Sequence, residues 1–155
     1  MIAERKKHIA VVGMGNLLMS DDGVGVHVVQ KLQKSCPDDV ELIDAGTSVI
    51  HTVDCLQGME HIVVVDALKA GCRPGTVYQM NGDDTLENDP TLSVHSLGLK
   101  TALKFLMNDD VPEQWMLIGV EPESLELGIG LSPPVRGALP DAVRAVKNLI
   151  KEWQV

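Results

Sequence analysis

Runs of aliphatic residues alternate along this chain with stretches in which apolar positions recur every three or four residues. Four runs rich in Val and Ile end near Gly, Asp or Glu, as buried strands commonly do. These runs cover residues 8–13, 40–44, 61–66 and 115–120. A further run at 76–80 alternates apolar and polar residues and follows the turn Arg73-Pro74-Gly75. Because its connection to the preceding run is short, we predict an antiparallel edge strand there.

The periodic stretches predict helices between and after these strands. In the first, Val24, Val28 and Leu32 recur every four residues, and Lys31 and Lys34 fall on the other side. A second helix is predicted after Ser93 as the N-cap, with an end at Asn108-Asp109-Asp110. Its apolar stripe consists of Leu99, Ala102, Leu103 and Leu106. A short helix is also predicted over about 48–56.

The last helix is predicted to begin with Ser132 as the N-cap and Pro133 in the first turn. Its apolar face consists of Val143, Val146, Ile150 and Trp153. Pro140 is expected either to kink this helix or to restart it, because proline cannot donate a backbone hydrogen bond.

Alternation of strands and helices predicts an α/β fold. We expect residues 1–155 to form a single three-layer domain, with a twisted, mostly parallel five-stranded sheet and helices on both faces. The run at 76–80 would be its antiparallel edge strand.

Charge and composition narrow the possible partners. The formal net charge of -9 repels phosphate backbones, so a nucleic-acid partner is not expected. The longest apolar stretches are far shorter than the roughly 20 residues of a membrane span, and a signal peptide is not recognised, so we expect a cytoplasmic protein without a membrane partner. The 3 cysteines lack CxxC spacing, which argues against a disulfide framework and a cysteine zinc site.

Acidic residues gather where the predicted strands end. Asp21 and Asp22 lie at the start of the first helix, and Asp44 and Asp66 close the second and third strands. In α/β sheets, ligands bind beyond the carboxyl ends of the parallel strands. Any one aspartate there could instead be a helix cap or a polar strand terminator. For one member of the adjacent pair we expect N-capping, which leaves the other for chemistry.

His95 lies in the first turn of the second predicted helix, and a neutral imidazole is a common metal ligand. The remaining histidines lack acidic company at a predicted strand end, so ordinary surface or hydrogen-bonding roles are expected for them. They are His8, His27, His51 and His61.

Familiar catalytic and cofactor signatures are missing. Gly13-Met14-Gly15 after a strand suggests a dinucleotide-binding loop, but the fingerprint GxGxxG requires glycine where this chain has Leu18. The Asp21-Asp22 pair would also repel a pyrophosphate. The chain contains neither a GxSxG elbow nor HExxH, which excludes those serine-hydrolase and zinc-peptidase signatures.

Six ordered segments resemble the hydrogenase maturation endopeptidase family, which acts on nickel-iron hydrogenase large subunits. The resemblance runs from the first strand almost to the C-terminus. The segments are GMGNLLMSDDGVG from Gly13, DAGT from Asp44, VVDA from Val64, PGT from Pro74, SVHSLGL from Ser93 and GVEPESLE from Gly119. The family usually has two glycines after the aspartate of the second strand, and here Ala45 replaces the first.

The resemblance implies an endopeptidase, a hydrolase that removes the C-terminal extension from the nickel-loaded precursor of a nickel-iron hydrogenase large subunit. It also implies a metal-contacting, catalytic trio: an acid after the first glycine loop, an aspartate ending the third strand and a histidine opening a later helix. These positions correspond to Asp22, Asp66 and His95. Asp21 is then the aspartate for which helix capping is expected.

Nickel is the metal that the resemblance implies, and no further cofactor site is predicted. Two carboxylates and an imidazole are acceptable nickel ligands, but they include no thiolate and leave the coordination incomplete. The free enzyme should therefore bind nickel weakly, and the substrate should supply it. Two roles remain open for the metal: signalling that the precursor is loaded, and polarising the scissile carbonyl or activating water.

Two alternatives remain open, and the first of them uses the same trio. A non-catalytic nickel-binding adaptor or chaperone for hydrogenase assembly would bind the precursor but leave its mass unchanged. A nucleotide-binding module would be stabilised by dinucleotides in a thermal-shift experiment.

Overall fold

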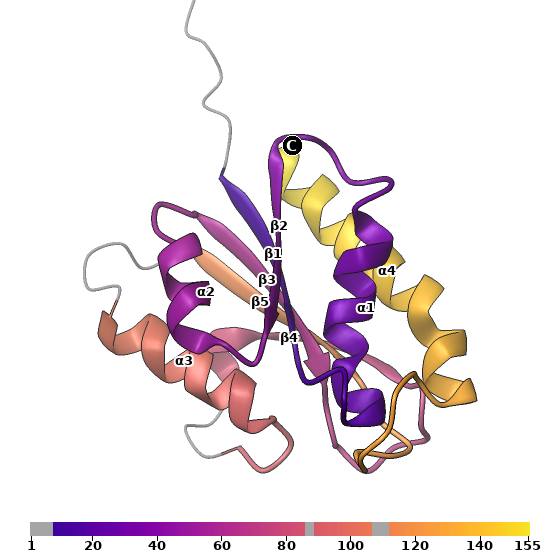
Figure 1. The fold of residues 1–155 in the computed structure, drawn as a ribbon. Helices are drawn as coiled ribbons and strands as arrows, with labels where there is room; N and C mark the ends of the chain where they lie inside the picture. Colours follow the sequence, from indigo (N-terminus) through magenta and orange to yellow (C-terminus); the bar gives the residue numbers. More distant parts are fainter. Residues whose placement is uncertain (1–7, 86–88, 107–111) are drawn as a thin grey trace, which may run out of the picture.

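A five-stranded sheet with helices on both faces forms the framework of the protein (Figure 1). The structure is a computed structural model and describes residues 8–85, 89–106 and 112–155. Its strands are β1 (Ile9–Met14), β2 (Val40–Gly46), β3 (His61–Ala67), β4 (Val77–Asn81) and β5 (Gln114–Val120). Its α-helices are α1 (Val24–Leu32), α2 (Val49–Cys55), α3 (Val94–Leu106) and α4 (Pro133–Gln154). Two 3-10 turns, η1 (Ser20–Gly23) and η2 (Gly82–Asp84), complete the elements.

The strand order is β2-β1-β3-β5-β4, and the pairs among the first four strands of that order are parallel. β4 pairs with β5 in the antiparallel direction and forms an edge. The predicted mixed sheet with an antiparallel edge strand is therefore confirmed. Within the described ranges, every helix is too short or too polar to cross a lipid bilayer.

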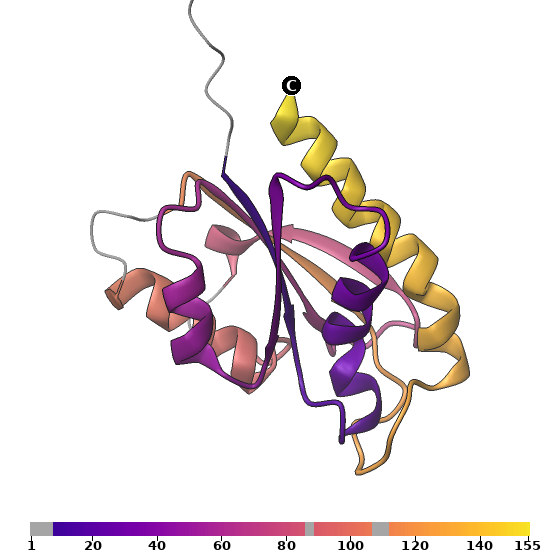
Figure 2. The ribbon, with the colours of Figure 1, turned by 45° about the horizontal axis from the view of Figure 1, so that its top comes forward.

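Two apolar cores pack against the two faces of this sheet, because successive side chains of a strand point to opposite sides. α1 and α4 cover one core, in which Trp153 of α4 is buried. α2 and α3 cover the other, which contains Trp115 of β5. Figure 2 shows the two helical layers on either side of the strands.

The helices agree with the hydrophobic periodicity, with differences at their ends. α2 was expected over about 48–56 and is confirmed, with Ser48 as its N-cap. α4 runs through Pro140 as one helix, so the predicted restart is not seen. The predicted end of α3 at Asn108-Asp109-Asp110 lies outside the described residues.

Close contact between α1 and the sheet depends on a glycine. An ideal Cβ on Gly25 would lie 2.0 Å from the carbonyl oxygen of Val65 and 2.5 Å from that of Met14, too close for any side chain. Glycine therefore lets the first turn of α1 pack directly on the strand backbones. This contact fixes the preceding loop and η1 at the carboxyl end of β1 and β3.

Candidate active site

The loop between β1 and η1 folds around the carboxylate of Asp22. Gly15 has φ of 125°, and a Cβ there would lie 1.8 Å from the backbone oxygen of Asp22, so glycine is required at this crossing. The backbone N–H of Asn16 donates to Asp22 Oδ2 at 2.8 Å, and Asn16 Oδ1 accepts from the N–H of Leu18 at 2.9 Å. These bonds hold Asp22 at the edge of a cleft.

Asp66 lies near the end of β3 and is almost fully buried. The N–H of Ala67 donates to its Oδ1 at 2.8 Å, and the hydroxyls of Ser93 and Ser96 donate to its Oδ2. Burial raises the pKa of Asp66 to about 6, although the three donors oppose the rise; the nearby Asp22 carboxylate adds to it. Asp66 is thus enclosed beside the cleft: its hydrogen-bond partners Ala67 and Ser93 line the cleft, whereas Asp66 is not among the described residues that do so.

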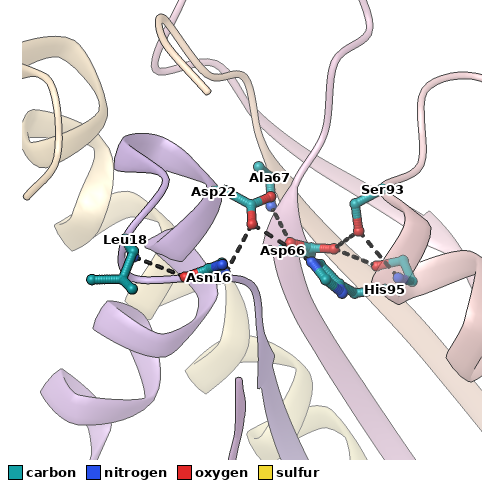
Figure 3. A network of polar contacts seen from close by, with 8 residues as sticks. Asn16, Leu18, Asp22, Asp66, Ala67, Ser93 and His95 are labelled. Carbon is teal, nitrogen blue, oxygen red and sulfur yellow. Dashed lines mark hydrogen bonds and ion pairs between the residues drawn. The ribbon is translucent and has the colours of Figure 1, made fainter. Parts of the chain in front are cut away.

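His95, in the first turn of α3, faces Asp22 across the cleft (Figure 3). Its Nε2 lies 3.7 Å from Asp22 Oδ2, and both side chains are partly exposed. The cleft has a volume of about 320 Å³ and is lined by Asp22, His95 and neighbouring residues. Those neighbours are Ala67, Lys69, Pro90, Thr91, Leu92, Ser93, Val94, Pro122 and Leu125.

The structure therefore brings Asp22, Asp66 and His95 to one end of the sheet, with Asp22 and His95 lining the cleft and Asp66 buried beside it; their catalytic and metal-binding roles stay a prediction. The fourth acid considered, Asp44, is exposed on the edge strand β2 and is not among the described residues that line the cleft. An open cleft with carboxylate and imidazole groups on its walls can bind a cation and leave room for a second ligand.

Asp21 has a different role from the helix capping that the sequence predicted. Its side chain is fully buried, and within the described residues no side-chain cap bond is found at the start of η1 or α1. Instead, Asp21 accepts hydrogen bonds from the N–H groups of Glu123, Ser124 and Ser132 at 2.9, 3.0 and 2.8 Å. Burial by itself raises the pKa of Asp21, but these hydrogen bonds outweigh it and lower the pKa.

Ser132 also departs from its prediction. It precedes α4 at the N-cap position, but its hydroxyl donates to Asp21 Oδ2 at 2.8 Å instead of capping the helix. Pro133 does occupy the first turn, where its missing N–H costs nothing. The segment 121–132, which we call the β5–α4 loop, is therefore tied to η1 by a buried carboxylate.

Glu121 lies at the same end of the sheet as the cleft, and no role was predicted for it from the sequence. It is buried directly after β5, and its Oε1 accepts from the N–H groups of Ala70 and Cys72 at 3.1 and 2.7 Å and from the Tyr78 hydroxyl at 3.0 Å. It fixes the chain that follows β3 beside the cleft. Its place at the end of a buried strand, the same signal that marked Asp66, could have found it.

A second cluster of ligand-type side chains lies at the opposite end of the sheet. Among the described residues, one potential ligand atom from each of Glu60, His61 and Glu113 lies within 4.8 Å of the other two. His61 packs on Trp153 with ring centroids 5.0 Å apart, and its Nε2 lies 3.9 Å from Glu113 Oε2. His61 thus has acidic company after all, but where β3 begins, in an ion-pair arrangement remote from the cleft.

Comparison with known proteins shows which family the chain resembles in sequence. A family model described as hydrogenase maturation protease matches residues 26–149, a range that includes Asp66 and His95 and begins just after Asp22. The hydrogenase 2 maturation protease of Escherichia coli is 33% identical over 153 residues, covering 93% of this chain and 91% of the relative.

Solved structures give the same result. The hydrogenase maturating endopeptidase HybD from Escherichia coli superposes with a TM-score of 0.84 at 32% identity, covering 93% of this chain and 92% of that one. The [NiFe] hydrogenase maturation protease HybD from Thermococcus kodakarensis gives 0.79 at 27% identity, covering 91% and 97%. With its sheet, its cleft and these similarities together, the chain belongs to the hydrogenase maturation protease family.

Proposed function

We propose that this protein removes the C-terminal extension from the nickel-loaded precursor of a nickel-iron hydrogenase large subunit. The observation that carries the proposal is the open cleft in which Asp22 Oδ2 and His95 Nε2 face each other at 3.7 Å, with the buried Asp66 next to Asp22. Family membership supplies the protease activity. We assign recognition of the precursor's nickel to Asp22, Asp66 and His95.

The donor set fits nickel as the cargo of a substrate. Carboxylate oxygens and an imidazole nitrogen bind divalent transition metals, but the site has no thiolate and leaves coordination positions open. A nickel ion already held by the precursor could accept these groups as additional ligands. The isolated protein should bind the ion weakly, because a site of this kind competes poorly with cysteine ligands.

Nickel bound at this cleft would place the neighbouring peptide bond against the protein. Fixing the bond in this way lowers the entropic part of the barrier to its hydrolysis. The pKa of about 6 for Asp66 means that the carboxylate is mostly ionised at neutral pH and can face a cation. The metal could also polarise the scissile carbonyl or activate the water that adds across the bond.

Exposed aliphatic side chains support a polypeptide substrate. Val94, which lines the cleft beside His95, is 82% exposed, and Leu125 of the β5–α4 loop, which also lines it, is 36% exposed. Further along the same loop, Leu127 and Ile129 are 81% and 90% exposed. Exposed apolar groups near a site commonly contact a protein partner. The β5–α4 loop is also held in place, because Ser20 donates to Glu126 and the N–H of Ser20 to Gly128.

The decisive experiment compares one precursor with and without inserted nickel. The protein is first passed through a chelating resin, and loss of the C-terminal peptide is followed by intact mass. We expect cleavage of the loaded precursor alone. Equal cleavage of both forms would remove nickel from recognition, whereas binding without any change of mass would favour the adaptor over the protease.

A further inference from the structure

Both oxygens of the buried Asp66 carboxylate are engaged by donors from defined elements. Oδ2 accepts the hydroxyls of Ser93 and Ser96, the latter at 2.6 Å, and Oδ1 accepts the N–H of Ala67 at 2.8 Å. Ser96 is itself buried, at 3% exposure. Among the described residues, Oδ2 therefore has two donors and Oδ1 has one, which makes Oδ1 the less occupied acceptor.

The less occupied oxygen, Oδ1, lies on the Asp22 side of the site. A Cβ built on Gly15 would lie 3.5 Å from Asp66 Oδ1, so this oxygen faces the loop that folds around Asp22. Ala67, which donates to the same oxygen, lines the cleft. The two serines therefore determine which oxygen of Asp66 remains available there.

The serines also connect Asp66 to the helix that carries His95. Ser93 and Ser96 flank His95 in the first turn of α3, and Figure 3 shows Ser93 and His95 beside Asp66. The Ser93 hydroxyl accepts the N–H of Ser96 at 3.1 Å, which makes Ser93 the N-cap that the sequence predicted. One hydroxyl thus caps α3 and holds the β3 carboxylate.

We propose that Ser93 and Ser96 are positioning residues for the cleavage reaction, orienting Asp66 so that Oδ1 faces the substrate and fixing the first turn of α3, with His95, against β3. The inference rests on the proposed function. The role it assigns to the serines acts through Asp66 and His95; Ser96 is not among the described residues that line the cleft, whereas Ser93 is and is therefore tested separately. Groups that orient metal-contacting side chains are commonly worth 10- to 100-fold in activity.

The test uses the full chain and the nickel-loaded precursor. For Ser96→Ala and Ser93→Gly we expect kcat to fall by roughly 10- to 100-fold, with KM changed by less than about 3-fold, because docking of the precursor is unaffected. Glycine is chosen at 93 because it keeps most of the N-capping preference while removing the hydroxyl. Ser93→Thr restores a hydroxyl and should recover kcat to within about 3-fold of wild type.

Thr101→Ala is the matched control. Thr101 is exposed on the same helix, and its hydroxyl donates to the backbone oxygen of Leu97, remote from Asp66. It should leave kcat unchanged, and all variants are assayed at a temperature where circular dichroism finds them folded. Wild-type kcat in folded Ser96→Ala and Ser93→Gly would overturn the inference while leaving the protease function intact.

A crystal structure of the Ser93→Gly/Ser96→Ala double variant tests the same inference without any cleavage. We expect the Asp66 carboxylate to rotate or to occupy more than one rotamer. An unchanged carboxylate would overturn the inference. If wild-type protein shortens no loaded precursor, the proposed function fails, and this structure still decides whether the serines orient Asp66.

Discussion

Asp21 and Asp22 are adjacent in the sequence but belong to two different regions of the molecule. Asp21 is fully buried, and its carboxylate is occupied by donors from the β5–α4 loop. Asp22 is partly exposed in the cleft, and in the described part of the chain its hydrogen-bond donor is the N–H of Asn16.

The difference shows what separates a structural carboxylate from one available for chemistry. Every acceptor position that the protein itself fills is lost to a ligand. Asp21 uses its negative charge to hold two segments together, whereas Asp22 retains acceptor positions that face His95. Residue type and place along the chain are nearly identical, so the number of donors and the exposure decide the role.

The largest expected effect tests the cleft side of this comparison. Asp22→Asn should lower the rate of precursor cleavage by roughly 100-fold or more, because an amide neither carries the charge nor binds a cation as well. Its unfolding free energy should change by less than about 1 kcal/mol, since the side chain is partly exposed. Intact mass and urea unfolding measure the two quantities. Asp44→Asn is the control, because Asp44 is exposed on β2. An Asp22→Asn variant that cleaves as fast as the wild type would contradict the assignment of Asp22 to the chemistry.

Asp21→Asn should give the opposite result. The amide NH2 of the new Asn is a donor and would face backbone N–H groups that are donors themselves. This mismatch and the loss of charge-assisted hydrogen bonds should lower the unfolding free energy by about 3 kcal/mol. Because the folded pKa of Asp21 lies below the unfolded value of 3.8, its stabilisation is present above that pH and is lost on further acidification. Asp21→Asn should therefore lack this contribution to the pH dependence of the unfolding free energy under acidic conditions.

Asp141→Asn is the control for that experiment, because Asp141 is exposed and pairs with Arg144 on α4. It should change the unfolding free energy by less than about 0.5 kcal/mol. A variant of Asp21 as stable as the wild type at neutral pH would mean that the carboxylate does not hold the β5–α4 loop.

A smaller effect concerns pH and Asp66. If ionised Asp66 is needed, kcat/KM should be constant above pH of about 7 and fall tenfold per unit well below the pKa of about 6. The effect of Asp66 on stability is opposite to that of Asp21. Because the folded pKa of Asp66 lies above the unfolded value of 3.8, its contribution to the unfolding free energy falls as pH rises from 3.8 to about 6. A flat kcat/KM profile down to pH of about 4.5, with circular dichroism unchanged, would contradict the requirement.

The smallest effect concerns the surface that Asp21 holds in place. Leu127→Ser and Ile129→Ser should each raise KM for the precursor by about 3- to 10-fold with kcat unchanged. The reason is that each removes an apolar contact that binds the precursor equally well in the ground state and in the transition state. Val155→Ser is the control, since Val155 is fully exposed and follows α4, outside the β5–α4 loop. Unchanged KM in both loop variants would remove the β5–α4 loop from precursor binding.

The fold was predictable because its signals are local. The aliphatic run at 61–66 and the spacing of Val24, Val28 and Leu32 each specify an element without reference to the rest of the chain. Parallel strands then bring Asp66 near the loop after β1, which is why two members of the site could be placed together. His95 was added through the resemblance and its helix start.

The partners of these acids were not predictable, because they come from distant segments. Asp21 and Ser132 are 111 residues apart, and Asp66 and Ser96 are 30 apart. Periodicity says nothing about which carboxylate will meet which donors. Asp21 therefore had the sequence pattern of a helix cap, and its true partners became visible only in three dimensions.

The chain's 2 tryptophans are distributed one to each of the two cores, Trp153 between the sheet and α1/α4 and Trp115 between the sheet and α2/α3. Their indole N–H groups donate to Gln114 and Asp83, respectively. Replacing either with phenylalanine leaves a single tryptophan, whose emission, excited selectively over that of Tyr78, reports on one layer. Cooperative melting of the shared sheet would make the two emission signals change together, whereas a layer that loosens on its own would be seen in one signal first.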